Sequence, residues 1–247
     1  MAYRIDLKNE VALVTGGSRN IGLAIAGALV EAGARVCIWG GSDRAGLEAA
    51  AGALGGDRGT AMGGIVRVEN EGEVLAAFDG IESQYGPVTI LVNNAAERPH
   101  EPLNTLSREA WTATVDVIMT GAFLTSRELF RRLPEGRNGA IVNIGGLSAH
   151  RPARHRAHVV AAKAGLVGLT RALAEEGLGR VRANCVVPGA IETDRRAGQS
   201  APSFASESKY GLGQPVDVAR AVLSLADPAE PFVTGQTVHV NGGRFMP

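Results

Sequence analysis

Cysteine, aromatic side chains and net charge are all scarce in this chain of 247 residues. It has 2 cysteines, 4% aromatic residues, and 25 basic side chains against 25 acidic ones. Cys37 and Cys185 lie in short apolar runs that resemble buried strands, which argues against a disulfide framework and favours a reducing cytoplasm. Because the charges balance, no overall field favours nucleic acid or an anionic membrane as a partner.

Long hydrophobic runs are missing as well. No stretch of about 18 uninterrupted apolar residues occurs, so no membrane-spanning helix is predicted. Residues 1–10 carry charges and lack the apolar run of a signal peptide or a membrane anchor. The sequence therefore predicts a cytoplasmic protein, and it offers no set of metal ligands.

What the chain does contain is an alternation of apolar, strand-like runs and helix-length amphipathic segments. The hydrophobic fraction of 45% and the 33 glycines suit an α/β protein with many tight turns. We expect strands at 11–14, 36–39, 65–68, 90–92, 140–144, 182–187 and 237–240, and helices at 21–32, 44–54, 73–85, 109–133, 157–178 and 216–225. Continuous apolar strands are buried on both faces, as in a parallel sheet covered by crossover helices. The prediction is one Rossmann-type domain over residues 1–247, with a doubly wound parallel sheet of about seven strands and helices on both faces.

The segment 194–213 is rich in serine, glycine and alanine and has no clear period. It is predicted to be a flexible flap over the strand ends that faces the substrate, or an ordinary surface excursion.

Four motifs, in order along the chain, carry a family resemblance. They are Thr15-Gly16-Gly17-Ser18-Arg19-Asn20-Ile21-Gly22, Leu91-Val92-Asn93-Asn94-Ala95-Ala96, Val187-Pro188-Gly189 with Thr193, and Val233-Thr234-Gly235-Gln236 through Asn241-Gly242-Gly243. Together they make the chain similar to the short-chain dehydrogenase/reductase family over essentially its whole length. The resemblance implies a scaffold that binds NAD(P) and interconverts alcohols and ketones.

The resemblance also implies a cofactor site at the glycine-rich turn, where backbone N–H groups and a helix N-terminus meet a pyrophosphate. The residues that it assigns to this site are Gly16, Ser18, Arg19, Asn20, Ile21, Asn94, Ala95, Lys163, Pro188, Gly189, Ile191 and Thr193. Asn20 replaces the family's middle glycine. Asparagine tolerates a left-handed backbone, so the turn either survives with less room for phosphate or no longer holds a nucleotide.

The adenosine end of that site departs from the family pattern. Gly40-Gly41-Ser42 follows the second strand, where an acidic residue would hold the ribose hydroxyls of NAD. Arg19, and more weakly Arg44, are candidates for facing a 2′-phosphate, which favours NADP over NAD; the alternative is that both are solvated surface arginines. Arg67 stands where the family has an aspartate that touches adenine, and Ala96 replaces the last glycine of its motif. These departures predict dinucleotide binding that is weakened or lost.

Catalysis in this family uses an asparagine, a serine, a tyrosine and a lysine. Lys163 is retained, and its position assigns Val159 to the tyrosine and Gly146 to the serine, while the helix motif assigns Ile118 to the asparagine. An isopropyl group moves no proton, so Lys163 would be a remnant in a degenerate member of the family. A positioned acid or base contributes about 10²- to 10⁴-fold to the rate, and such groups act as a unit.

Nearby residues offer replacements. Ser148 lies two residues beyond the expected serine, and His155 and His158 precede the tyrosine position. Imidazole has a suitable pKa for acid and base catalysis. The alternative is a basic, solvated loop, whose members are Arg151, Arg154, His155, Arg156 and His158. Together with Arg195 and Arg196, that loop would attract a carboxylate or a coenzyme A phosphate.

Three functions remain open. The first is an inactive subunit that pairs with an intact paralogue in a hetero-oligomer, such as a tetramer built through helices 109–133 and 157–178. The complex would act on an alcohol, a ketone or a hydroxyacyl-CoA. The paired dehydrogenase subunits of benzylsuccinate-type aromatic degradation have a similar arrangement. The second is an oxidoreductase, dehydratase or cyclase with non-standard acid and base residues. The third is an NADP(H) sensor without turnover.

Overall fold

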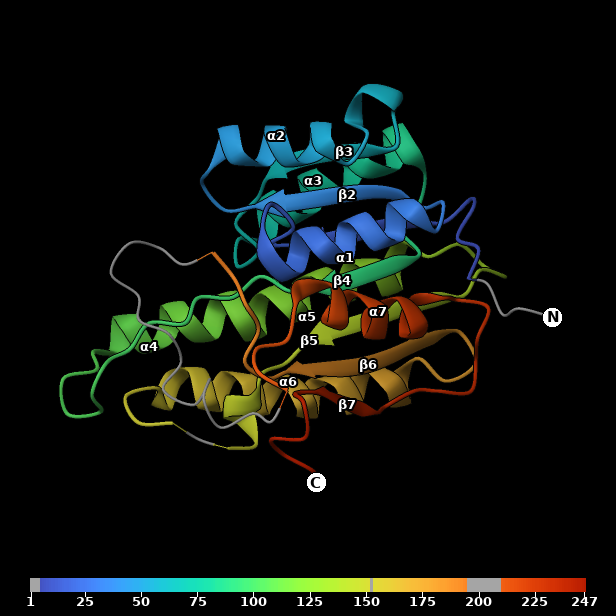
Figure 1. The fold of residues 1–247 in the computed structure, drawn as a ribbon. Helices are drawn as coiled ribbons and strands as arrows, with labels where there is room; N and C mark the ends of the chain where they lie inside the picture. The colour runs from blue at the N-terminus through green and yellow to red at the C-terminus, as the bar shows by residue number, and fades with distance from the viewer. Residues whose placement is uncertain (1–4, 152, 195–209) are drawn as a thin grey trace.

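The computed structural model describes residues 5–151, 153–194 and 210–247. A parallel sheet of seven strands runs through the molecule in the order β3-β2-β1-β4-β5-β6-β7 (Figure 1). The strands are β1 Val11–Thr15, β2 Arg35–Gly40, β3 Ala61–Ile65, β4 Ile90–Asn93, β5 Gly139–Ile144, β6 Val181–Pro188 and β7 Thr237–Val240. The predicted fold is confirmed.

Helices cover both faces of the sheet. They are α1 Asn20–Glu31, α2 Arg44–Ala53, α3 Glu71–Tyr85, α4 Arg108–Val115, α5 Gly121–Arg132, α6 Ala157–Glu176 and α7 Pro215–Ala226, with short 3₁₀ turns η1 Gly56–Arg58 and η3 Leu147–Ala149. Figure 1 shows α1 and α7 in front of the sheet and α5 and α6 behind it. One apolar core lies under α1, α2 and α7, and a second lies under α3, α5 and α6. The wholly buried strands β1, β4, β5 and β6 separate these cores, which explains their continuous apolar sequences.

Two predicted elements are corrected. The third strand was expected at 65–68 but spans Ala61–Ile65. Gly63 packs against α2, where a Cβ would lie 3.0 Å from Leu47 Cγ, a tight contact that disfavours a larger residue although glycine has low strand propensity. Val66 and Val68 are buried in the second core after the chain has left the strand.

The long helix expected at 109–133 is interrupted. The π-helical segment η2, Asp116–Thr120, separates α4 from α5. π-Helical segments are rare, and those that do occur are often located at functional sites. This one holds Ile118, one of the predicted site positions.

Helix α6 is, within the described ranges, the one helix long and apolar enough to cross a membrane by length and composition. It packs instead along β6, and it carries the buried Lys163. These contacts are those of a core helix.

A buried ion network ties α5 to α3. Glu128, 2% exposed, accepts hydrogen bonds from Arg127 and from Arg132 Nε at 3.2 and 3.1 Å. Arg132 also bonds to Asp79 and Glu82 of α3, at 2.6 and 3.0 Å. The network fixes α5, whose N-terminal end continues into η2.

Candidate functional site

The strand order reverses between β1 and β4, which lie side by side in the sheet. In a doubly wound sheet, ligands bind at the carboxyl ends of the strands on either side of such a reversal. The glycine-rich turn follows β1, and the Asn93-Asn94-Ala95-Ala96 motif follows β4. The topology therefore brings the two predicted motifs to the same edge.

Hydrogen bonds lock these two motifs together. The Asn94 side chain donates to the carbonyl oxygens of Thr15 and Gly16, at 3.0 and 2.9 Å. The Thr15 hydroxyl accepts the backbone N–H groups of Asn94 and Ala95, both at 3.0 Å. A Cβ at Gly22 would lie 2.1 Å from the Gly16 carbonyl oxygen, so only glycine allows the helix to start this close to the turn.

The N-terminus of α1 is open to a ligand. Arg19 is its N-cap residue and makes no side-chain capping hydrogen bond. The first N–H groups of a helix without such a cap bind anions readily, with the helix dipole in support. Together with Gly16, whose φ of 63° favours glycine, this turn fits the pyrophosphate of a dinucleotide.

Asn20 adopts the left-handed backbone, with φ of 52°, so the turn keeps its shape. Its amide group has a further role that the sequence did not reveal. Nδ2 donates to the carbonyl oxygen of Asp194 at 3.2 Å, and Oδ1 accepts the Asp194 N–H at 2.8 Å. This bridge joins the phosphate turn to the loop after β6.

The predicted arginines on the adenosine side differ in what they contact. Arg19 is exposed and has no ion pair within the described ranges. Arg44 is also exposed, and it pairs with Glu48 of its own helix at 3.7 Å. Arg67 is held by Glu73, which accepts from Arg67 Nε at 2.8 Å and raises the pKa of the guanidinium. Arg19 therefore remains the better-placed candidate for a 2′-phosphate.

The loop after β6 reaches the same edge. A Cβ at Gly189 would lie 2.7 Å from Asn241 Cα, so this loop depends on glycine to pass the end of β7. Ile191 forms a parallel bridge with Gly213, which holds together the two described ends of the predicted flap. Arg195, Arg196 and most of the segment 194–213 lie outside the described residues. Of the remaining predicted cofactor residues, Ser18, Ile21 and Thr193 are partly exposed, and Pro188 is buried.

Two of the positions predicted for the tetrad, Val159 and Ile118, are buried among other residues of the core. Val159 is 1% exposed and lies one turn before Lys163 on α6. Ile118, also 1% exposed, packs in a small apolar cluster with Ala122, Ala162 and Leu166.

Lys163 is almost wholly buried. Its Nζ donates to the carbonyl oxygen of Ile144 at 2.5 Å. Burial, followed by the positive charge of Arg98, lowers the pKa of Lys163 to about 7. An amine with such a pKa can exchange a proton at physiological pH.

Ser148 lies close to Gly146, the position predicted for the family's serine. The η3 turn folds it back, so that a Cβ built on Gly146 would lie 3.6 Å from Ser148 Oγ and 3.8 Å from Lys163 Cγ. The Ser148 hydroxyl and the Lys163 side chain therefore both border the space that a serine at 146 would use.

The two predicted histidines lie in different surroundings. His155 is exposed, has φ of 61°, and accepts the N–H of Glu101 at its carbonyl oxygen at 2.8 Å. His158 is wholly buried, and neither ring nitrogen has a hydrogen-bond partner within the described ranges.

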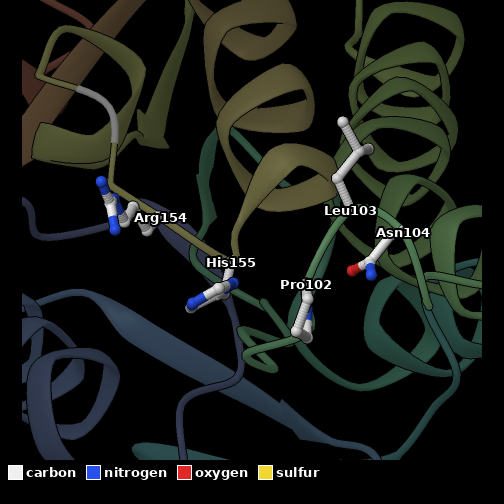
Figure 2. Close-up of a pocket in the computed structure, with 5 residues that line it drawn as sticks. All are labelled: Pro102, Leu103, Asn104, Arg154 and His155. Atoms are coloured by element: carbon white, nitrogen blue, oxygen red, sulfur yellow. The ribbon is translucent and has the colours of Figure 1, made fainter.

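Sequence reasoning missed Arg98 and His100. Arg156 Nε donates to His100 Nε2 at 2.8 Å, and Arg98 is close enough to Arg156 and Lys163 to lower the pKa of both, after burial. The signal was present in Arg98-Pro99-His100, two basic side chains directly after the β4 motif. Next to this group a cavity of about 530 Å³ opens between two loops, with Pro102, Leu103 and Asn104 on one and Arg154 and His155 on the other (Figure 2).

Comparisons with known proteins agree with this arrangement. A family model described as enoyl-(acyl carrier protein) reductase matches residues 16–244. The 3-oxoacyl-[acyl-carrier-protein] reductase FabG of Vibrio cholerae is 37% identical over 247 residues, which cover 98% of this chain and 100% of the relative. FabG of Escherichia coli is 33% identical over the same shares of both chains.

Among solved structures, a candidate gluconate dehydrogenase from Agrobacterium tumefaciens superposes with a TM-score of 0.90. It is 32% identical, and the match covers 98% of both chains. The likeness is thus one of sequence as well as of fold over nearly the whole length. The chain belongs to the short-chain dehydrogenase/reductase family.

Proposed function

We propose that this chain is a non-catalytic subunit that pairs with an intact member of its family in an NAD(P)-dependent alcohol dehydrogenase or ketone reductase. The observation that carries the proposal is Val159, which is buried at the position where the family's acid/base tyrosine stands, one turn before Lys163. Ile118 is likewise packed into an apolar cluster. Both positions serve the stability of the fold and offer no proton to a substrate.

Dinucleotide binding remains part of the proposal. The locked turn around Gly16, the uncapped start of α1 and the exposed Arg19 suit a cofactor with a 2′-phosphate, so NADP is favoured over NAD. The bound cofactor would supply or accept the hydride. In this chain Asn94 holds the turn in shape, and Lys163 Nζ donates to the carbonyl oxygen of Ile144 at the end of β5.

Exposed apolar side chains support the assembly. Trp111 on α4 and Phe123 on α5 are 38% and 45% exposed. Large apolar side chains on the surface of neighbouring helices are typical of interfaces. A partner of the same family, joined through α4, α5 and α6, would cover them.

The substrate class that we favour is an acyl thioester with a 3-hydroxy or 3-oxo group. The relatives named 3-oxoacyl-[acyl-carrier-protein] reductases support this choice. A hydroxyacyl-CoA of the kind met in benzylsuccinate-type degradation has the same reacting group, and the basic loops at the cavity would suit its phosphates.

Native mass spectrometry of the protein, purified gently from its own cells, tests the assembly. We expect a complex that contains a second chain of similar size with the serine, tyrosine and lysine of the family. A complex that contains copies of this chain alone would contradict the proposal.

Restoring the tetrad tests the missing chemistry. The purified wild-type chain should show no NADPH-dependent reduction of a 3-oxoacyl thioester, whereas the combined variant Val159→Tyr, Gly146→Ser, Ile118→Asn should gain measurable turnover. The space at 146 permits a serine, because its Cβ would meet Ser148 Oγ at an ordinary 3.6 Å. Turnover by the wild-type chain that matches an intact relative would overturn the proposal.

A second candidate function has its own observation. Ser148 Oγ and the side chain of Lys163, whose pKa lies near 7, both flank Gly146, at 3.6 and 3.8 Å from where its Cβ would stand, and a hydroxyl and an amine could serve a different acid/base site. This would make the chain an oxidoreductase or dehydratase with altered chemistry. Unaided turnover that is lost in Ser148→Ala, and kept in His155→Gln and His158→Gln, would favour this function over the first.

A further inference from the structure

The loop after β4 and the loop before α6 meet and bring basic side chains together. The backbone N–H of Glu101 donates to the carbonyl oxygen of His155 at 2.8 Å, and this bond holds the loop after β4 against the loop before α6. Arg98 and His100 belong to the first loop and Arg156 to the second. The cavity of about 530 Å³ opens beside this junction (Figure 2).

No described carboxylate forms an ion pair with this group. The ion pairs of the described residues involve other cations, such as Arg127, Arg132 and Arg137. Glu97 and Glu101 lie in the same loop as Arg98, but neither pairs with it or with Arg156. Like charges gathered without a counter-ion destabilise a fold by their repulsion. A bound anion would remove that cost.

Hydrogen bonding within the group leaves donors free for a ligand. Both Nε and Nη2 of Arg156 approach His100 Nε2, so the imidazole is a neutral acceptor on that side and keeps its proton on Nδ1. Desolvation lowers the pKa of His100. The charges of Arg156, His155 and His158 lower it further. Among the residues that the structure describes, the guanidinium of Arg98 and the remaining N–H groups of Arg156 have no hydrogen-bond acceptor.

The start of α6 adds to the positive potential. Arg156 is the N-cap residue of this 20-residue helix and makes no side-chain capping hydrogen bond, so the first N–H groups remain available. His158, the second helical residue, is wholly buried with neither ring nitrogen partnered in the described part of the chain. A buried polar group without a partner is costly and indicates a ligand or water beside it.

We propose that Arg98, His100 and Arg156 form a binding site for an anionic group of the substrate, a phosphate ester or a carboxylate, held at the start of α6. The arginines bind its oxygens with their forked N–H groups, and His100 donates from Nδ1. This inference rests on the proposed function, since it names the ligand class of the same cleft. It does not depend on a partner chain or on turnover.

Inorganic phosphate and succinate are the probes that test it. Calorimetric titration of the purified protein should show binding of at least one of the two anions, and the double variant Arg98→Ala, Arg156→Ala should bind it at least about tenfold more weakly, as expected when two charge-assisted contacts are lost. Arg220→Ala is the matched control, because it removes an exposed arginine in the middle of α7. This variant should bind the anion as wild type does. Melting temperatures of all variants establish that they are folded.

The imidazole of His100 gives a readout at the site itself. Saturation with the anion should raise the pKa of His100, because a nearby negative charge favours the protonated ring. An NMR pH titration measures this pKa, and the His100→Gln variant assigns the resonance. Tighter binding of phosphate identifies a phosphate ester as the ligand, and tighter binding of succinate identifies a carboxylate.

Two results would overturn the inference. One is unchanged affinity in the double variant together with an unmoved His100. The other is affinity lost in Arg19→Ala but kept in the double variant, which would place the anion at the glycine turn. Neither result bears on the native mass of the complex, so failure here is distinguishable from failure of the proposed function.

Discussion

The amide of Asn20 exchanges two hydrogen bonds with the backbone of Asp194, although the two residues are separated by 174 positions in the chain. Asn20 stands in the turn that faces the pyrophosphate position, and Asp194 stands in the loop after β6. The side chain therefore ties the glycine-rich turn to the loop after β6, next to the expected position of the pyrophosphate.

Replacing Asn20 by glycine should strengthen dinucleotide binding. The change removes the bridge and the side chain, and it suits the positive φ of 52°. We expect NADPH affinity, measured by fluorescence titration, to rise several-fold, while the free energy of unfolding changes by no more than about 1 kcal/mol, because the lost hydrogen bonds are exposed. Asn20→Ala, which keeps a Cβ, is the matched comparison. Equal or weaker binding by Asn20→Gly would show that the bridge does not obstruct the cofactor.

Lys163 should make stability depend on pH. Burial lowers its pKa from 10.5 to about 7. Between these values the unfolded chain binds more protons than the folded one, so stability should rise with pH across that window, by about 1.4 kcal/mol per unit of pKa difference. Lys163→Met should lack this rise, whereas Lys8→Met, a change at an exposed lysine, should retain it. Urea unfolding between pH 7 and 10 measures the slopes, and parallel curves for wild type and Lys163→Met would refute the shift.

Glu128 should be a stabilising residue far from the cleft. It is 2% exposed and accepts from Arg127, Arg131 and Arg132. Glu128→Ala leaves the partly buried guanidinium groups of Arg127 and Arg132 without their shared acceptor, and should lower the free energy of unfolding by about 2–4 kcal/mol. Glu48→Ala, which removes an exposed partner of Arg44, should cost less than about 0.5 kcal/mol. Denaturant melts that show equal losses would contradict this assignment.

The two cysteines should be inert in the folded protein. Both are free and buried, and burial raises the pKa of Cys37 to about 12 and that of Cys185 to about 11. Because the thiolate is the reactive form, a thiol reagent at pH 8 should modify neither until the protein unfolds, and both afterwards. Ser224→Cys, on the exposed side of α7, should react at once. Rapid modification of the folded wild-type chain would contradict this prediction, because it would require local opening of the sheet around β2 or β6.

Sequence alone determined the fold class and the family, because both depend on local and repeated signals. Continuous apolar runs such as Ile90–Asn93 identify strands buried on both faces, and the glycine-rich turn is specific because Gly16 and Gly22 allow approaches that no side chain permits. The same reasoning assigned Val159, Gly146 and Ile118 to the tetrad positions through their spacing from Lys163 and the helix motif.

Contacts between distant segments were decided by the tertiary structure. No local pattern could place Ser148 beside Gly146 and Lys163, since the η3 turn that folds it back has no periodic signature. The strand at Ala61–Ile65 was missed because glycine has low strand propensity. The close packing of Gly63 on Leu47 is visible only in the folded structure. The pairing of Arg156 with His100, and of Asn20 with Asp194, likewise depends on how the sheet brings separate loops to one edge. A sequence states which side chains are available, and packing decides which of them meet.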